Sequence, residues 1–144
     1  MPMTWFFWAL LAAVAAALTA ILAKIGVTAV PSTTATAIRT VVVLFAAWAL
    51  VFFLGEHKGL TNIPRRSLVF LVLSGLATGV SWLAYFRALQ MAPASLVSPI
   101  DKLSLPLTIV LAALWLREPV NWQMTVGVTL MTVGALMIWY WSPT

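Results

Sequence analysis

The residues with the clearest capacity for chemistry are charged side chains set inside apolar segments. Asp101 and Lys102 are neighbours in an apolar stretch, with Pro99 and Pro106 on either side of them. Three further cations stand inside neighbouring apolar stretches: Lys24, Arg39 and Arg87. A charged side chain in a bilayer is costly, and by default it marks a path for substrate or ions, or a buried ion pair. If these stretches cross a membrane, the charges are the candidate site.

The composition of the chain indicates a membrane protein. Of its 144 residues, 63% are hydrophobic and 8% are charged, whereas a soluble domain has about 25% charged residues. The mean hydropathy is +1.06. Part of the net charge of +5 lies within apolar segments. We therefore interpret these charges as signals for orientation in the membrane and as parts of a site, and we expect no nucleic-acid partner.

The residue types present also restrict the chemistry. The chain has no cysteine and one histidine, His57, so disulfides, thiolate metal sites and an all-histidine metal site are excluded. It has no nucleophile elbow, phosphate-binding glycine loop or His–Glu metal motif. Glu118 beside Arg117 is interpreted as an interfacial ion pair at the start of the last helix. We predict that the chain is not an enzyme and uses no cofactor or metal.

Five apolar segments each approach the ~20 residues that a helix needs to cross the bilayer core. They are Trp5–Gly26, Thr34–Leu54, Ser67–Leu89, Ser95–Leu116 and Trp122–Trp141. Helices satisfy every backbone group in lipid, so the predicted fold class is an all-α integral membrane protein with a bundle of five transmembrane helices. The first segment could be a signal peptide, but no Lys or Arg precedes it, and we favour a retained helix. We predict a single domain over residues 1–144.

The embedded charges are predicted to form a layer on one side of the membrane. Asp101 is its only acid, so we expect Asp101 to pair with Arg87 or Arg39. The positive surplus favours a small-molecule substrate that is anionic or zwitterionic, with a carboxylate or phosphate. Alternatively, protonation of Asp101 is the coupling step. The predicted substrate-binding or coupling residues are Asp101, Arg87 and Arg39, with Lys102 as a weaker candidate.

The same charges also have structural explanations. Lys24 and Lys102 stand close enough to an interface to extend along lipid and place their ammonium groups among the headgroups. Arg39 and Arg87 could equally be locked to Asp101 in a permanent ion pair. The sequence leaves both alternatives open.

The fourth segment is predicted to be kinked. Pro106 has no N–H for the Lys102 carbonyl, and its ring opens that turn. A polar stripe follows steps of three and four residues through Ser98, Asp101, Ser104 and Thr108. Backbone groups without an intrahelical hydrogen bond are tolerated at membrane depth where protein or a water-lined cavity covers them. We therefore expect this helix to line a cavity; the alternative is a kinked packing helix.

Loop charges and small residues predict the arrangement in the membrane. Residues 55–66 and 117–121 hold most of the loop cations, which places these loops in the cytoplasm, the N-terminus inside and the C-terminus outside. Counting the embedded cations as well balances the two sides. If these cations act as topology signals, insertion in both orientations becomes possible; if they are buried site residues, the N-in orientation stands, and we favour it. In the third helix, Gly75 and Gly79 form a small-xxx-small pattern that predicts close helix packing.

The third to fifth helices resemble the EamA-type domain of the drug/metabolite transporter superfamily. The residues that carry the resemblance are Tyr85, Ala88 and Leu89, the Pro-Ala-Ser-Leu-Val turn at 93–97, Pro99, Glu118, and the Gly127/Gly134 pair, with Ala37–Thr40 in the second helix. The resemblance implies one half of the ten-helix inverted-repeat fold, similar to the short five-helix bacterial and archaeal members.

That resemblance carries expectations about function. It implies a secondary transporter, expected to be an exporter, of small metabolites or drugs, working by alternating access as an antiparallel homodimer in the bacterial or archaeal inner (plasma) membrane. Related four-helix multidrug proteins have an acid in helix one, where this chain has Lys24, which argues against export of lipophilic cations. The alternative is a non-transporting membrane subunit that partners another protein or assists translocation of a lipid-linked solute.

Overall fold

The computed structural model describes residues 4–141, and within that range the chain is helical with no strand. Five helices are long and apolar enough to cross a membrane: Trp5–Gly26, Ser32–Phe53, Arg65–Met91, Ala94–Leu116 and Trp122–Tyr140. The predicted fold class is confirmed, and each predicted helix end lies within two residues of the observed one.

The chain divides into two compact units, residues 1–91 (unit 1) and 92–144 (unit 2). Unit 1 contains α1 (Thr4–Gly26), α2 (Ser32–Phe53), the short 3₁₀ helix η1 (Glu56–Asn62) and α3 (Arg65–Met91). Unit 2 contains α4 (Ala94–Asp101), α5 (Ser104–Leu111), the π-helical turn η2 (Ala112–Leu116) and α6 (Trp122–Tyr140). The prediction of a single domain stays a prediction.

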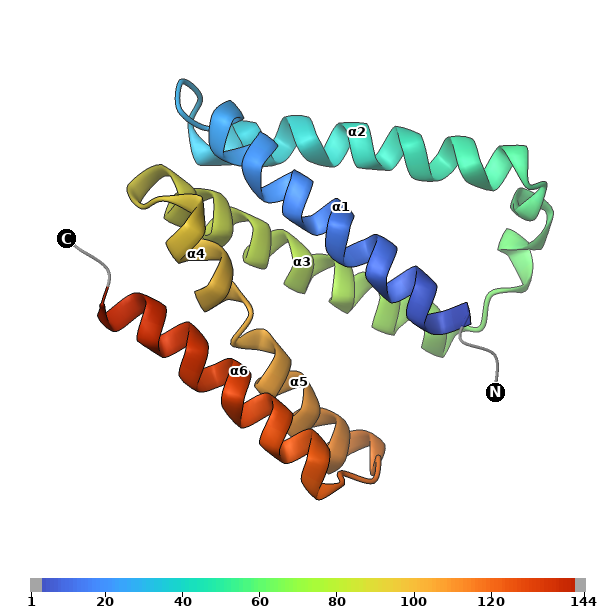
Figure 1. Ribbon diagram of the computed structural model, residues 1–144. Coiled ribbons are helices and arrows are strands. Elements are labelled where there is room, and N and C mark those ends of the chain that lie inside the picture. The colour runs from blue at the N-terminus through green and yellow to red at the C-terminus, as the bar shows by residue number, and fades with distance from the viewer. Residues whose placement is uncertain (1–3, 142–144) are drawn as a thin grey trace. The chain divides into compact units, whose positions relative to one another are not determined.

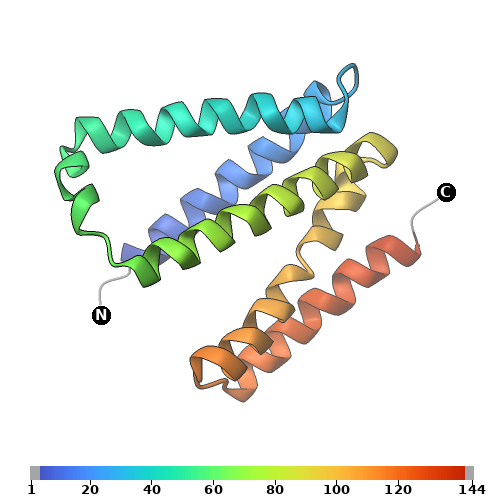
Figure 2. The same ribbon diagram turned by 180° about the vertical axis from the view of Figure 1, so that it is seen from behind.

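In unit 1 the three long helices alternate in direction. Figures 1 and 2 show the short α1–α2 connection beside the C-terminal end of α3, while η1 joins α2 to α3 at the opposite end. The boundaries follow from local residues: Pro31 and Pro64 immediately precede α2 and α3, with φ of Pro31 at −54°. Gly55 follows α2 with φ of 74°, a left-handed conformation that glycine adopts without steric cost.

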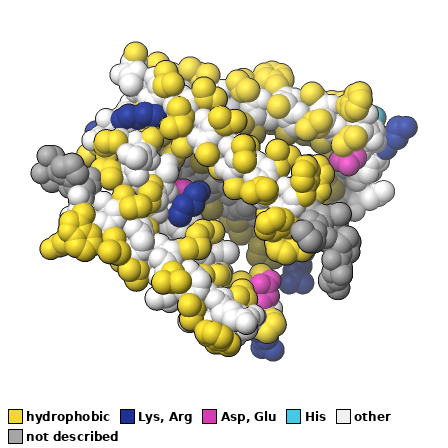
Figure 3. Space-filling model, in the orientation of Figure 1, with side chains coloured by type: hydrophobic (Ala, Val, Ile, Leu, Met, Phe, Trp, Pro, Cys, Tyr) yellow, Lys and Arg dark blue, Asp and Glu magenta, His cyan; other side chains and the backbone are white. Residues whose placement is uncertain are grey.

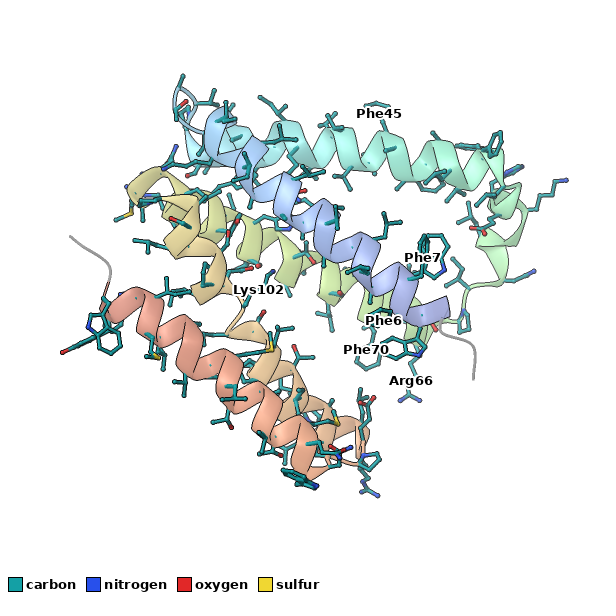
Figure 4. The ribbon with its side chains drawn as sticks, in the orientation of Figure 1. Phe6, Phe7, Phe45, Arg66, Phe70 and Lys102 are labelled. Atoms are coloured by element: carbon teal, nitrogen blue, oxygen red, sulfur yellow. The ribbon has the colours of Figure 1, made fainter. Side chains whose placement is uncertain are left out.

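The buried core is small and lies mostly in unit 1. The buried side chains of the described residues are Ala20, Val27, Thr36, Phe86 and Leu89 in unit 1 and Ala135 in unit 2. Most large apolar side chains are exposed; Phe45, for example, is 71% exposed and points away from α2 (Figure 4). Apolar atoms cover most of the face in Figure 3, and charged atoms form small separate groups. Helices that are apolar all round are expected where lipid replaces water.

In unit 2, α6 packs along both α4 and α5 (Figures 1 and 2). The turn between η2 and α6 is fixed by the backbone: Arg117 adopts φ of 55°, and the Glu118 N–H donates to the Ala112 carbonyl at 3.3 Å. Asn121 then caps α6, because its Oδ1 accepts a hydrogen bond from the Met124 N–H at 2.8 Å.

The glycine faces of the long helices are open. The close packing predicted at Gly75 and Gly79 is not found within unit 1, because no atom beyond the local backbone of α3 and the chain neighbours lies within 4 Å of the position that a Cβ on either glycine would occupy. Gly127 and Gly134 are equally open within unit 2. The buried residues of α3, Phe86 and Leu89, instead lie toward its C-terminal end. Each unit therefore keeps a narrow helix surface available for a further contact.

Candidate functional site

Arg39 in α2 is held by aromatic rings of α3. Its guanidinium carbon lies 4.2 Å from the centroid of the Trp82 ring and 5.5 Å from that of Phe86. Both distances are within the ~6 Å range of cation–π attraction. Trp82 and Phe86 are four residues apart and therefore share one face of α3. Tertiary packing thus fixes Arg39 inside unit 1.

A cavity of about 340 Å³ adjoins Arg39 between α1, α2 and α3. Its wall is mainly apolar and includes Leu22, Val30, Ile38 and Phe86. As far as the structure describes the lining, it contains one charged side chain, Arg39, and one hydroxyl group, that of Thr19. The guanidinium is therefore the principal polar group available to anything that enters the cavity.

The C-terminal end of α3 is fastened to the α1–α2 connection by two side chains. Lys24 Nζ donates to the Leu89 carbonyl, which is one of the last four carbonyls of α3, where a helix offers no N–H four residues on. Gln90 Nε2 donates to the carbonyls of Val27 at 3.3 Å and Val30 at 2.8 Å. Lys24 is half-buried. It therefore contacts the C-terminal end of α3, and its extension to the headgroups stays a prediction.

A second cavity, of about 360 Å³, lies at this end of unit 1 and is mainly polar. Its lining includes Lys24, Thr28, Arg87 and Gln90. Arg87 is exposed, and its Nη1 contacts Gln90 Oε1 at 3.4 Å, which is long for a hydrogen bond. Arg87 is thus exposed at the end of unit 1 that also carries Lys24, and its place in the predicted layer stays a prediction.

The fourth span is interrupted between α4 and α5, where Asp101 and Lys102 stand. The Lys102 N–H donates to the Ser98 carbonyl at 3.3 Å and the Pro99 carbonyl at 3.2 Å. The Lys102 carbonyl accepts from the Leu105 N–H at 2.9 Å, a bond between residues three apart. Pro106 has no N–H to offer this carbonyl, and the tighter bond takes its place. The predicted kink is confirmed, and Figure 4 shows Lys102 at the interruption.

Asp101 forms an ion pair with Lys102 in unit 2. Lys102 Nζ lies 3.3 Å from Asp101 Oδ2, and the two side chains are 53% and 37% exposed, respectively. Arg87 and Arg39 belong to unit 1, so the predicted pairing of Asp101 with either of them stays a prediction.

The predicted polar stripe on the fourth helix is divided by the interruption. Ser98 and Asp101 belong to α4, whereas Ser104 and Thr108 belong to α5. The Thr108 hydroxyl donates to the Ser104 carbonyl at 2.8 Å, so that group is satisfied within its own helix. The charged feature of this region is the Asp101–Lys102 ion pair.

Comparison with known proteins agrees with this architecture. Residues 3–140 match the EamA-like transporter family. This chain belongs to that family. It is 48% identical over 138 residues, 96% of this chain and 98% of the relative, to a protein of a Sinorhizobium species named as an uncharacterised transporter in the cobO 3′ region. An uncharacterised protein of Methanocaldococcus jannaschii is 22% identical over 83 residues, 58% of this chain and 61% of that protein. No solved structure matches the chain.

The family and the five spans make this EamA-like protein a multi-pass membrane transporter. Within the described residues, no three His, Cys, Asp or Glu side chains are grouped closely enough to hold a metal ion.

Two residues that contact the candidate site residues were not predicted from the sequence: Trp82 and Gln90. Trp82 had a recognisable signal, because it lies well inside α3, whereas tryptophans in membrane helices concentrate at the interfaces. Gln90 stands next to the end of α3, where carbonyls need donors, but its acceptors lie 60 and 63 residues away in the chain. Such contacts depend on tertiary packing, which sequence spacing does not give.

Proposed function

We propose that this chain is a secondary carrier that moves small metabolites or drugs by alternating access, in the direction of export, across a bacterial or archaeal inner (plasma) membrane. Membership of the EamA-like family supports a transporter. The observation that carries the proposal is the Asp101–Lys102 ion pair at the interruption of the fourth span. Interrupted helices and ionisable side chains at membrane depth are features of transport sites.

In this proposal the substrate is an anionic or zwitterionic small molecule. A carboxylate or phosphate of the solute competes with Asp101 for Lys102, while an ammonium group or a proton competes with Lys102 for Asp101. Arg87 and Arg39 supply further positive charge in unit 1. The proposed substrate-binding or coupling residues are thus Asp101, Arg87, Arg39 and Lys102. No step of this cycle requires catalysis or a cofactor.

The proposed working assembly is an antiparallel homodimer. A five-helix chain corresponds to half of an inverted-repeat carrier, and a second copy in the opposite orientation would complete the repeat. The open helix surfaces at Gly75 and Gly79, and at Gly127 and Gly134, are suited to further helix contacts.

Single-cysteine labelling tests the orientation, because the native chain has no cysteine. Ala29→Cys lies in the α1–α2 connection, and Gly59→Cys lies in η1 at the other end of α2. An impermeant maleimide applied to intact cells is expected to label a fraction of both variants. Labelling confined to one of them fixes a single orientation and contradicts the antiparallel homodimer.

Transport is tested with the purified full chain in proteoliposomes. The probes are phenylacetate, glycerol phosphate, glutamate and tetraphenylphosphonium, which cover carboxylate, phosphate, zwitterion and lipophilic cation. We expect flux of at least one anion or zwitterion by the wild type, a fall to background in Asp101→Asn, and normal flux in the matched control Glu56→Gln in η1. Wild-type flux without dependence on Asp101 overturns the assigned site. No flux of any probe overturns the carrier proposal and favours the non-transporting subunit.

A further inference from the structure

Arg39 is a cation inside unit 1 without a carboxylate near it in the described part of that unit. The only acid in residues 4–91 is Glu56, which lies in η1, about 20 Å away along α2 at 1.5 Å rise per residue. The contacts with Trp82 and Phe86 contribute about 0.5–2 kcal/mol, less than the several kcal/mol that an embedded charge costs. Within the described part of unit 1, no carboxylate therefore balances the charge of this guanidinium.

The ring contacts also hold the Arg39 side chain in place. A guanidinium carries N–H donors in a planar fork, and this fork matches the two oxygens of a carboxylate. The Phe86 ring is 2% exposed, so the side chain that supports Arg39 is itself held by packing. Arg39 is therefore set in place before any ligand arrives.

The adjoining cavity supplies the second half of a site. Its volume of about 340 Å³ is near the lower end of the ~300–1,000 Å³ found for ligand pockets. Its apolar lining from Leu22, Val30 and Ile38 would cover a hydrocarbon or aromatic body, while Arg39 would meet a head group. This volume suits a ligand with few heavy atoms rather than a two-chain lipid.

We infer that unit 1 holds a binding site for a small amphipathic carboxylate, with its carboxylate on Arg39 and its apolar body in the cavity between α1, α2 and α3. A single negative charge balances one guanidinium, whereas a phosphate dianion would leave the site with an uncompensated charge in an apolar setting. As a substrate site this inference rests on the proposed carrier function, and it names the class of substrate that unit 1 would receive.

The test measures equilibrium binding to the purified full chain in detergent micelles by titration calorimetry. Three probes of similar shape and different charge are used: phenylacetate, phenylacetamide and phenethylammonium. We expect phenylacetate to bind at least tenfold more tightly than the other two. In Arg39→Gln its affinity is expected to fall at least tenfold, since removing a charge-assisted pair costs 1.4 kcal/mol or more and each 1.4 kcal/mol is tenfold.

The matched control is Arg66→Gln. Arg66 also lies over an aromatic ring, at 6.0 Å from the Phe70 centroid, but at the start of α3 and away from the cavity (Figure 4). Its affinity for phenylacetate is expected to equal that of the wild type. Equal losses in Arg39→Gln and Arg66→Gln, or equal affinities for the three probes, overturn the inference.

A second variant keeps the test decisive if Arg39→Gln fails to fold. Gly26 lines the cavity, and a Cβ added there would meet open space, so Gly26→Leu is chosen to add bulk at the cavity wall, with circular dichroism checking that the variant folds. Phenylacetate affinity is expected to fall about tenfold although Arg39 is retained. Unchanged affinity overturns the placement of the ligand body.

Native mass spectrometry from phosphatidylglycerol nanodiscs separates the two sources of an anion. Retention of this phospholipid by the wild type and its loss in Arg39→Gln would assign the site to lipid and overturn the inference.

The binding test and the transport test can fail independently of each other. Phenylacetate binding without flux leaves the site intact and removes the carrier proposal, whereas Asp101-dependent flux of another probe without phenylacetate binding removes only this inference.

Discussion

The cations of unit 1 and the ion pair of unit 2 are held in opposite ways. Arg39 contacts Trp82 and Phe86, and Lys24 contacts the Leu89 carbonyl, so each bridges two helices that are distant in the chain. Lys102 instead contacts its immediate neighbour Asp101, at a point where the helix is interrupted. The first arrangement depends on tertiary packing, and the second needs only local backbone.

This difference indicates which region is rigid and which can exchange partners. A side chain that satisfies an orphan carbonyl of another helix cannot leave without exposing that carbonyl, which costs free energy in an apolar setting. Two exposed neighbouring side chains lose little when they separate. The Lys24 and Gln90 contacts of unit 1 are therefore expected to respond to mutation mainly in stability, and the α4–α5 interruption mainly in transport.

Removing the Lys24 ammonium should give the largest change in stability. Lys24→Met is expected to lower the free energy of unfolding by about 2–3 kcal/mol, because a charged donor is lost and the Leu89 carbonyl is left without it. The measurement is SDS-induced unfolding in mixed micelles, followed by circular dichroism. Lys58→Met, in exposed η1, is the control and should change stability by less than about 0.5 kcal/mol. Equal stability of the two variants would contradict the capping role.

Loss of the Gln90 amide should have the next largest effect. Gln90→Leu is expected to cost about 1–2 kcal/mol in the same assay, because the Val27 and Val30 carbonyls lose a neutral donor. Gln123, exposed in the first turn of α6, supplies the matched control Gln123→Leu. Amide exchange in residues 27–30 should rise in Gln90→Leu alone. Unchanged exchange there would show that Gln90 does not fasten the connection.

The fold was predictable because it depends on local quantities. Apolar length alone locates the five spans to within two residues, and Pro106 alone predicts the interruption near Lys102. The identity of the embedded cations was predictable for the same reason. Their partners were not, because the Arg39–Trp82 and Lys24–Leu89 contacts depend on how three helices meet. The open faces of Gly75 and Gly79 show the same limit, since a packing pattern does not say which helix will use it.

The interruption itself can be tested by restoring the missing N–H. Pro106→Ala would let residue 106 donate to the Lys102 carbonyl and join α4 to α5. Pro106 lies in the first turn of α5, where the missing N–H costs little, so the expected gain in stability is only about 1 kcal/mol. Flux through the proteoliposomes should nevertheless fall several-fold, because the interruption between α4 and α5 is lost. Pro119→Ala, in the loop before α6, is the control. Equal flux in both variants would show that transport does not depend on the interruption.

The smallest expected effect is the coupling between Asp101 and Lys102. A double-mutant cycle with Asp101→Asn, Lys102→Met and the double variant should give an interaction of about 0.2–1 kcal/mol, the range measured for exposed ion pairs. A value of several kcal/mol would mean that the pair is shielded from water and permanently closed. That outcome would remove the contrast between the two regions, because a pair so strongly coupled could not yield either partner to a solute. A small value is what a carrier needs here: charges that hold one another at rest and separate when a substrate or proton replaces one of them.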